Sequence, residues 1–250
     1  LEMYVLGNQN DSVYQYNLTT AWDISTASYD QSFSVSSQDS FPQSIHFKSD
    51  GTKMFMLGSS GKDLNEYDLS TAWDISTASY SQNKTVNTMR LGGSGGGQFK
   101  PDGTAFFTAH NGSGEGVFKH ELSTAWDVST MTSVPATTDF FKFTDSFFAV
   151  QGMFISPHGD NFYWCDDVFN SIKHYSMSTA WDVSTLSSVG SKGVGSQDGK
   201  PFGVFFKTDG TKMYLCGNAN DKIYQYTLST AWTVSTASYD SINFSVASQD

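Results

Sequence analysis

The segment LSTAWDISTASY, residues Leu69–Tyr80, repeats almost letter for letter the earlier segment LTTAWDISTASY, residues Leu18–Tyr29. Three more copies of this Trp-Asp phrase follow, and the five copies are centred on Trp22, Trp73, Trp126, Trp181 and Trp232. Successive centres lie 51, 53, 55 and 51 residues apart, and five such units fill all 250 residues. A unit of about 50 residues accommodates four short strands, which is one blade of a β-propeller.

The strands of a unit are clearest in the segment Ser44–Gly58, which has two apolar-rich stretches on either side of Asp50-Gly51. Asp-Gly favours a tight turn because glycine accepts a positive φ without steric cost. A third strand, such as Leu64–Leu69, precedes each Trp-Asp phrase, and a fourth, such as Ser32–Ser37, follows it. Short aromatic and β-branched runs separated by turn residues predict an all-β fold. The other units hold Asp102-Gly103, His158-Gly159 and Asp209-Gly210 at the turn.

We therefore predict a single domain over residues 1–250, an all-β, five-bladed β-propeller of four-stranded antiparallel blades with the first strand of each unit innermost. The innermost strand occurs only four times, because the segment Leu1–Gly7 already aligns with the second strand Thr211–Gly217. The first blade is therefore expected to lack its inner strand. An unpaired edge favours association, so a neighbouring segment, a second copy or a longer repeat chain is expected to fill it.

The charge balance limits the possible partners. The chain has 14 Lys and Arg against 25 Asp and Glu, a net charge of −11. This excess of acid argues against nucleic acid and anionic membranes as partners. No apolar run approaches the roughly 18 residues of a membrane span, so we expect no membrane insertion. Cys165 and Cys216 occupy the same apolar position in neighbouring units and are expected to be buried thiols without a disulfide.

The loops of the predicted propeller divide into two faces. The constant face carries the Asp-Gly turns and the Trp-Asp phrases, and the variable face carries polar loops that differ between blades. Loops on a rigid scaffold often carry recognition, although Asn, Asp and Gly are also ordinary turn residues. We predict ligand binding on the variable face, by Asn10, Asp11, Gln38, Asp39, Lys62, Asp63, Glu115, Asp166, Asp167, Gln197, Asp198, Asn220 and Asp221.

The five Trp-Asp phrases allow two interpretations. Each tryptophan can fold back over the apolar edge of its blade, while the following Asp and hydroxyl side chains satisfy loop backbone groups. Thr233 replaces Asp in the last copy, and its hydroxyl is expected to bond to the loop backbone in the same way. Alternatively, Trp22, Trp73, Trp126, Trp181 and Trp232 stack on sugar rings, and five equivalent sites provide avidity.

Motifs for catalysis or cofactors are not evident in the sequence. The five histidines are scattered, and no His-x-x-x-His or Cys-x-x-Cys spacing occurs, which argues against a transition metal. The glycine run Gly95–Gly97 lacks the Lys-Ser/Thr of a phosphate loop, and there is no Gly-x-Ser-x-Gly motif. Asp166 and Asp167 could join a calcium site, but the full ligand spacing is missing. We therefore expect no cofactor and no enzymatic activity.

Two resemblances follow from the repeat. The segments FKSDGTKMF (Phe47–Phe55) and FKTDGTKMY (Phe206–Tyr214), with the following YxLSTAWD phrases, resemble a propeller-repeat family of phage and marine microbial surface or structural proteins. The likeness covers essentially the whole chain. In blade count and repeat length only, the chain is also similar to the five-bladed tachylectin-type lectins, which bind amino sugars between blades.

These observations lead to three hypotheses of function. The leading one is a non-enzymatic, lectin-like or adhesin-like recognition module on a virion or cell surface, in an extracellular location, which binds a glycan or a cell-surface protein. The second is a structural or assembly propeller whose open blade is completed by a neighbouring segment or subunit. The third is a propeller glycosidase or lyase with carboxylates near the axis.

Overall fold

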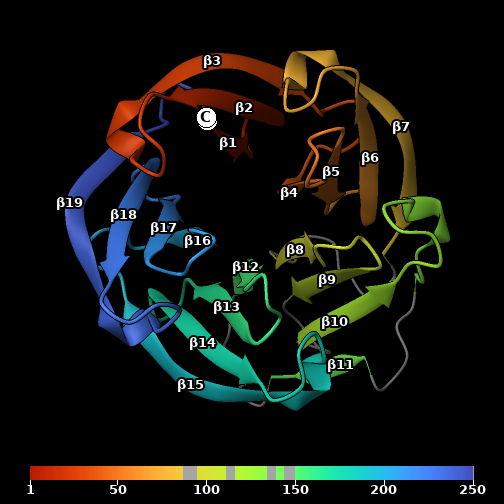
Figure 1. Ribbon diagram of the computed structural model, residues 1–250. Helices are drawn as coiled ribbons and strands as arrows, with labels where there is room; N and C mark the ends of the chain where they lie inside the picture. Colours follow the sequence, from red (N-terminus) through yellow and green to blue (C-terminus); the bar gives the residue numbers. More distant parts are fainter. Residues whose placement is uncertain (87–94, 111–115, 134–138, 144–149, 250) are drawn as a thin grey trace.

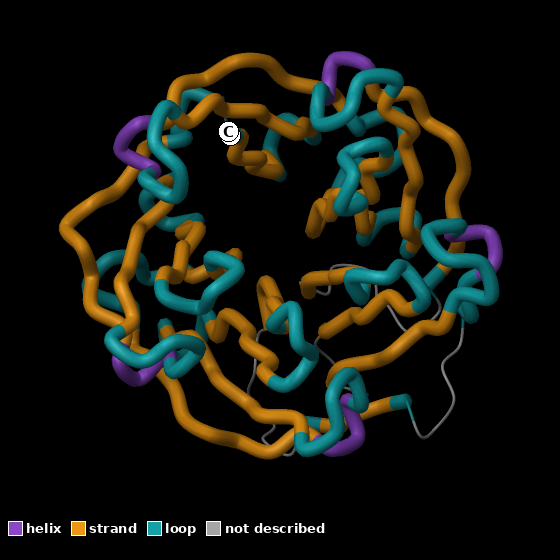
Figure 2. The backbone as a smooth tube through the Cα atoms, in the orientation of Figure 1, coloured by secondary structure: helices purple, strands orange, loops and turns teal. Residues whose placement is uncertain are grey.

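The computed structural model describes residues 1–86, 95–110, 116–133, 139–143 and 150–249. These residues form five antiparallel sheets arranged as a ring around a central axis (Figure 1). Figure 2 shows that strands and loops make up almost the whole backbone, with a short helical turn on the outside of each sheet. The prediction of a five-bladed, all-β propeller is therefore confirmed.

Each blade is one sheet, and its strands follow the chain outward from the axis. The five blades are, in chain order: β1 (Glu2–Gly7), β2 (Ser12–Leu18) and β3 (Ala27–Ser34); β4 (Pro42–Phe47), β5 (Lys53–Gly58), β6 (Asp63–Leu69) and β7 (Ala78–Thr85); β8 (Gly95–Phe99), β9 (Ala105–His110), β10 (Gly116–Glu121) and β11 (Phe140–Lys142); β12 (Val150–Ile155), β13 (Asn161–Asp166), β14 (Ser171–Met177) and β15 (Leu186–Gly193); β16 (Pro201–Phe206), β17 (Lys212–Gly217), β18 (Lys222–Leu228) and β19 (Ala237–Ser245). The 3₁₀ turns are η1 (Ile24–Thr26), η2 (Ile75–Thr77), η3 (Val128–Thr130), η4 (Val183–Thr185) and η5 (Val234–Thr236).

The first blade has three strands, as predicted. Strands β4, β8, β12 and β16 lie nearest the axis in the other four blades (Figure 1). In the first blade this place is not taken by any described strand, and β1 is the edge of its sheet.

The Asp-Gly turns and the tryptophans form one unit. Gly51, Gly103, Gly159 and Gly210 have φ between 72° and 75°, which only glycine adopts readily. The indole of the same blade lies over each glycine, so closely that an added Cβ would lie 2.4 Å from the ring. The backbone N–H of the tryptophan also donates to the glycine carbonyl, as in the 3.0 Å bond from Trp126 to Gly103. These turns therefore require glycine both for the backbone and for space.

Tryptophans also join neighbouring blades. The Tyr214 hydroxyl of the fifth blade donates to the Trp22 carbonyl of the first at 2.6 Å, and its ring stacks on Trp22. Phe55 of the second blade stacks on Trp126 of the third in the same way. The five tryptophans of the Trp-Asp phrases are half-buried, with φ between 63° and 69°. This geometry fits the packing role that the sequence left open.

The aspartate after each tryptophan caps the 3₁₀ turn that follows it. Asp127 accepts hydrogen bonds from the Ser129 N–H at 3.0 Å and from its hydroxyl at 2.6 Å, and Asp23, Asp74 and Asp182 do the same in their blades. The expectation for Thr233 is wrong. It makes no capping bond, because its hydroxyl is directed back toward the Ala231 carbonyl at 3.5 Å.

The two cysteines form no disulfide, as predicted. Cys165 is fully buried, whereas Cys216 is partly exposed at the junction of the fifth and first blades. Across the described residues, no helix has the length and apolar character needed to cross a membrane.

Candidate functional site

The aspartates of the Ser-Gln-Asp loops on the variable face tie two loops of one blade together. Asp39 accepts hydrogen bonds from the N–H groups of Phe41 at 2.6 Å and Gly61 at 2.7 Å. Asp198 accepts equivalent bonds from Lys200 at 2.8 Å and Asn220 at 3.1 Å. Both carboxylates are at least 97% buried. Their geometry is that of loop anchors.

The neighbouring glutamines have an internal partner as well. Gln38 accepts a hydrogen bond from the Tyr67 hydroxyl at 3.2 Å, and Gln197 accepts one from Tyr226 at 3.1 Å. The Asn220 side chain donates to the Gln197 carbonyl at 3.0 Å. These residues of the predicted binding set therefore use their polar atoms within the loops.

The remaining predicted residues are divided among several positions. Asp63 accepts from the side chains of Asn65 and Asn83, and Asn10 donates to the Gln249 carbonyl. Asp166 is fully buried, accepts from the N–H groups of Val168 and Phe169, and lies 3.4 Å from the Lys173 ammonium. Asp11, Lys62 and Asp221 occupy turn positions with left-handed backbone conformation, with φ of 46°, 54° and 47°. Glu115 lies outside the described residues.

A pocket of about 300 Å³ opens at the axis on the variable face. Five amide side chains and two phenylalanines form its wall. We call it the axial pocket, and its lining residues are Asn8, Gln9, Phe41, Gln43, Gln151, Phe202 and Asn218. An apolar wall with a few convergent amides is the usual form of a site for a small polar ligand.

β-Bulges place three of these side chains at the axis. The pairing of β4 with β5 skips from Pro42 to Ser44, so Gln43 is the extra, unpaired residue. The same shift leaves Phe202 unpaired in β16, and in β12 Gln151 lies within the irregular stretch between Val150 and Met153. A bulge turns a side chain out of the regular alternation, and here the result is a ring of bulge residues around the pocket.

Two carbonyl oxygens of the axial pocket have hydrogen-bonding capacity to spare. Gln151 is 93% buried, and its amide nitrogen donates to Asp167 at 2.7 Å. The side-chain oxygens of Gln151 and Gln43 are buried and have no hydrogen-bond partner among the described residues. Buried polar atoms without a partner are costly, so each is suited to accept a hydrogen bond from a hydroxyl group of a ligand.

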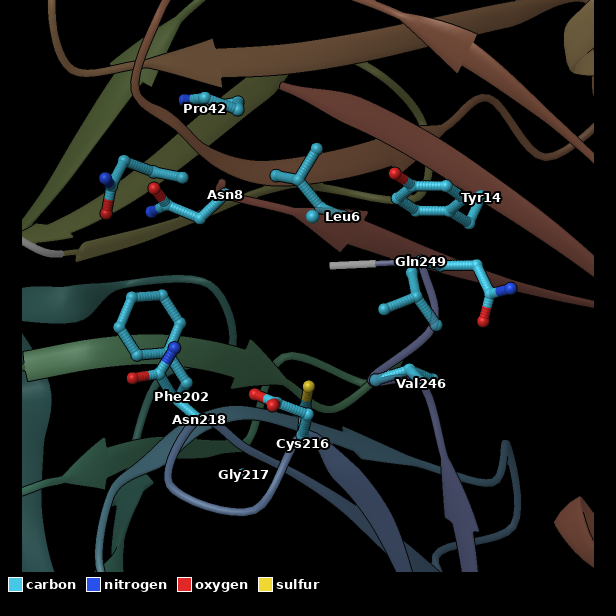
Figure 3. Close-up of a pocket in the computed structure, with 14 residues that line it drawn as sticks. Leu6, Asn8, Tyr14, Pro42, Phe202, Cys216, Gly217, Asn218, Val246 and Gln249 are labelled. Carbon is cyan, nitrogen blue, oxygen red and sulfur yellow. The ribbon is translucent and has the colours of Figure 1, made fainter. Parts of the chain in front are cut away.

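A smaller cavity of about 60 Å³ adjoins the axial pocket and shares Asn8, Gln43, Phe202 and Asn218 with it. We call it the seam cavity, because it lies between the first and fifth blades. Figure 3 shows Leu6 and Tyr14 of the first blade facing Cys216 and Val246 of the fifth. Asp221 is the acidic residue of its wall. Among the predicted residues, Asp221 lines this cavity and Asp167 supports the axial pocket through Gln151.

The sequence interpretation missed the bulge residues. A signal was present: Gln43 and Phe202 each follow a proline at the start of an inner strand. Proline lacks the N–H needed to continue the ladder, so a strand beginning at Pro42 or Pro201 is prone to irregular pairing.

A second groove, of about 530 Å³, lies on the constant face between the third and fourth blades. Most of its charged side chains already have partners: Lys119 pairs with Glu121 at 2.7 Å, and Lys100 pairs with Asp102 at 2.8 Å. Asp182 caps its own 3₁₀ turn. Within the described ranges, no group of three His, Cys, Asp or Glu residues is placed to hold a metal ion.

Comparison with known proteins supports the fold. No protein-family model matches the sequence, and no curated protein matches it. A protein of unknown function from Desulfotomaculum acetoxidans superposes with a TM-score of 0.52 at 10% identity, over 97% of this chain and 66% of its own. The periplasmic gluconolactonase of Pseudomonas aeruginosa does so with a TM-score of 0.52 at 12% identity, over 94% of this chain and 64% of its own. A candidate 6-phosphogluconolactonase from Bacteroides uniformis gives 0.52 at 11% identity, over 95% and 66%.

At these identities the likeness establishes the propeller fold, and this chain spans about two thirds of the length of each of those proteins. The named activities are lactonases, so the predictions of a lectin-like or adhesin-like module and of no enzymatic activity are contradicted. The reason for the error is general: one propeller scaffold serves enzymes and lectins alike, so the repeat cannot exclude an enzyme. The phage and tachylectin resemblances find no support in these matches.

Proposed function

We propose that this protein hydrolyses a sugar-acid lactone bound in the axial pocket. The observation that carries the proposal is the pair of side-chain carbonyl oxygens of Gln43 and Gln151 at the propeller axis, which are buried and have no partner among the described residues. Sugar hydroxyl groups are the donors that such oxygens accept. The gluconolactonase and the candidate 6-phosphogluconolactonases among the structural neighbours supply the reaction class.

The charge of the pocket favours an unphosphorylated lactone. Neither the axial pocket nor the seam cavity has a Lys, Arg or His among its described lining residues. The chain as a whole carries a net charge of −11. A phosphate group would be repelled by this field and would have no cation to pair with.

Asp221, in the wall of the adjoining seam cavity, is the proposed general base. Its carboxylate takes a proton from water, the water oxygen attacks the lactone carbonyl carbon, and the amide groups of Asn8 and Asn218 donate to the developing oxyanion. The ring C–O bond then breaks, and the departing ring oxygen receives the proton from Asp221. The product is the open-chain hydroxy acid, and the base is regenerated.

The test is hydrolysis of D-glucono-1,5-lactone followed by pH-stat against the spontaneous rate. Asp221→Asn is expected to lower kcat by at least about 100-fold, because a general base contributes that much. The turn should survive, since Asn170 occupies the same left-handed position in the fourth blade with φ 48°. Asp11→Asn, at the equivalent turn of the first blade, is the matched control and should retain activity.

Gln151→Ala separates binding from chemistry. We expect a higher KM with a smaller change in kcat, because Gln151 would bind substrate hydroxyl groups in both ground and transition states. A wild-type rate equal to the spontaneous rate, or full activity in Asp221→Asn, would overturn the proposal.

A location outside the cytoplasm is part of the same proposal. It is supported by the periplasmic gluconolactonase among the structural neighbours.

A further inference from the structure

We propose that the exposed edge of β1 binds an extended peptide segment with the sequence pattern of this chain's own inner strands, which completes the first blade as a fourth, antiparallel strand. The inference does not depend on lactone hydrolysis, because it rests on the backbone of β1 and on the packing between the first and fifth blades.

The first observation is the hydrogen-bonding pattern of β1. The Leu18 N–H of β2 donates to the Leu1 carbonyl at 2.9 Å. Since bonded pairs alternate along an antiparallel ladder, Met3 and Val5 also bond to β2, and the backbone groups of Tyr4 and Leu6 point away from it. No described strand pairs with that edge.

The second blade shows what this edge bonds to when it is occupied. Residues Lys53, Phe55 and Leu57 of β5 correspond to Glu2, Tyr4 and Leu6 of β1. The Lys48 N–H, next to β4, donates to the Lys53 carbonyl at 3.0 Å. The same bond recurs between Lys207 and Lys212 in the fifth blade. The edge of β1 therefore presents a ladder that other blades of this chain fill with an inner strand.

The second observation is the packing between blades. Each of four inter-blade cores contains apolar residues of the inner strand that follows it, which are Ile45 and Phe47 of β4, Phe99 of β8, Met153 and Ile155 of β12, and Val204 and Phe206 of β16. The core between the fifth and first blades, built around Tyr14, Tyr16 and Tyr214, has no inner-strand residue.

Exposure confirms that this core is incomplete. Phe154 of β12 is only 6% exposed, because its ring packs against Phe205 of the next inner strand with ring centroids 5.2 Å apart. Phe205 holds the equivalent position in β16 and is 53% exposed. Cys216 is partly exposed, whereas Cys165 is fully buried at the same position. Residues 3–6 are half-buried, whereas residues 54–57 are at most 1% exposed. The missing contacts are therefore those that an inner strand makes.

The occupant follows from the register. Ser44 and His46 of β4 lie opposite Leu57 and Phe55 of β5. Counted from Pro42 as the first, the third and fifth residues of an inner strand therefore make the backbone hydrogen bonds to the next strand. Ile45 and Phe47, at the fourth and sixth positions, enter the inter-blade core. A fitting segment is therefore extended, with apolar residues at its fourth and sixth positions.

The probe is a synthetic peptide with the sequence of residues 42–51, added to the intact 250-residue protein. We expect saturable binding by calorimetry. Alkylation of Cys216 by N-ethylmaleimide, read by mass spectrometry, should slow by about tenfold or more at saturation because the strand covers the thiol. Cys165 serves as the internal reference, since it is fully buried with and without peptide.

Two N-methylated peptides test the strand geometry. Methylation of the backbone nitrogens at the Ser44 and His46 positions removes two ladder donors and should weaken binding by about tenfold or more. The backbone N–H groups at the Ile45 and Phe47 positions point away from the ladder toward the axis, so methylation there should be tolerated.

Equal binding of the two methylated peptides, binding that leaves Cys216 reactive, or no binding would each overturn the proposal. So would a dimer of the protein alone, by sedimentation, in which Cys216 is already protected, because the occupant would then be a second copy.

Discussion

At the residue scale, the repeated Trp-Asp phrase and the Asp-Gly turn solve one steric problem together. Gly103 lies beneath the Trp126 indole with φ 75°, and the indole is held there by the backbone bond between the two residues. The sequence predicted the turn correctly because Asp-Gly has a local conformational meaning. It did not indicate that the indole lies over the same glycine, because that contact joins residues 23 positions apart.

Gly103→Ala is expected to destabilise the protein by about 2–5 kcal/mol. An L-residue at positive φ costs about 1–2 kcal/mol, and the displaced indole adds about 1–3 kcal/mol of overpacking. Urea unfolding followed by tryptophan fluorescence measures the change. Gly193→Ala is the control, since its added Cβ meets nothing within 4 Å, and it should stay within about 0.5 kcal/mol of wild type. Equal stability of the two variants would contradict this account.

At the element scale, strand existence and order could be predicted, whereas strand irregularity was signalled only by the prolines before Gln43 and Phe202. The apolar stretches, the turns and the missing inner strand all follow from comparing the units with one another. The bulges at Gln43, Gln151 and Phe202 depend on how each inner strand meets its neighbours at the axis. The axial pocket is built from these bulges. It opens on the face that the sequence interpretation favoured, whereas the loop residues named there mostly bond within their own loops.

The contact between blades can be tested through one hydroxyl group. The Tyr163 hydroxyl donates to the Trp232 carbonyl at 2.5 Å and joins the fourth blade to the fifth. Tyr163→Phe is expected to cost about 1–2 kcal/mol, because the carbonyl loses its partner at a part-buried contact. The ring should keep its place, since Phe55 and Phe107 occupy the same position in their blades. Tyr29→Phe, an exposed tyrosine, should show no measurable change in the urea midpoint.

At the scale of the whole molecule, two buried histidines and the half-buried His46 make stability depend on pH. Burial lowers the pKa of His46, His120 and His174 to about 4, from an ordinary value of about 6.5. The folded protein therefore binds these protons less tightly than the unfolded chain. The free energy of unfolding therefore receives its full contribution from these histidines above about pH 6.5. It falls as the pH is lowered toward 4, because unfolding then takes up protons.

Urea midpoints measured between pH 7.5 and 4.5 check this expectation. His46→Gln should lower the pH dependence by up to about one proton, because one linked group is removed. Gln98 occupies the equivalent position of β8, where its amide bonds to the Ile155 backbone at 2.8 and 2.9 Å, so the change suits the fold. An unchanged pH dependence in the variant would rule out His46 as a linked group. Below about pH 4, aspartates such as Asp127 contribute, since the Ser129 hydroxyl holds the pKa of that carboxyl below its usual range.

The join between the first and fifth blades also determines how the ring closes during folding. The contact between Tyr214 and Trp22 spans 192 residues, whereas the equivalent contact between Tyr163 and Trp232 spans 69. Loop-closure entropy grows only with the logarithm of length, so the longer span costs about 0.9 kcal/mol more. That is about the net contribution of one hydrogen bond, whereas the β1 edge of the first blade, beside this seam, lacks a whole ladder of them among the described residues. The ring should therefore open first where its hydrogen-bond ladder is missing, with chain topology a minor term, and hydrogen exchange of the β1 amides should report that opening before any other blade exchanges.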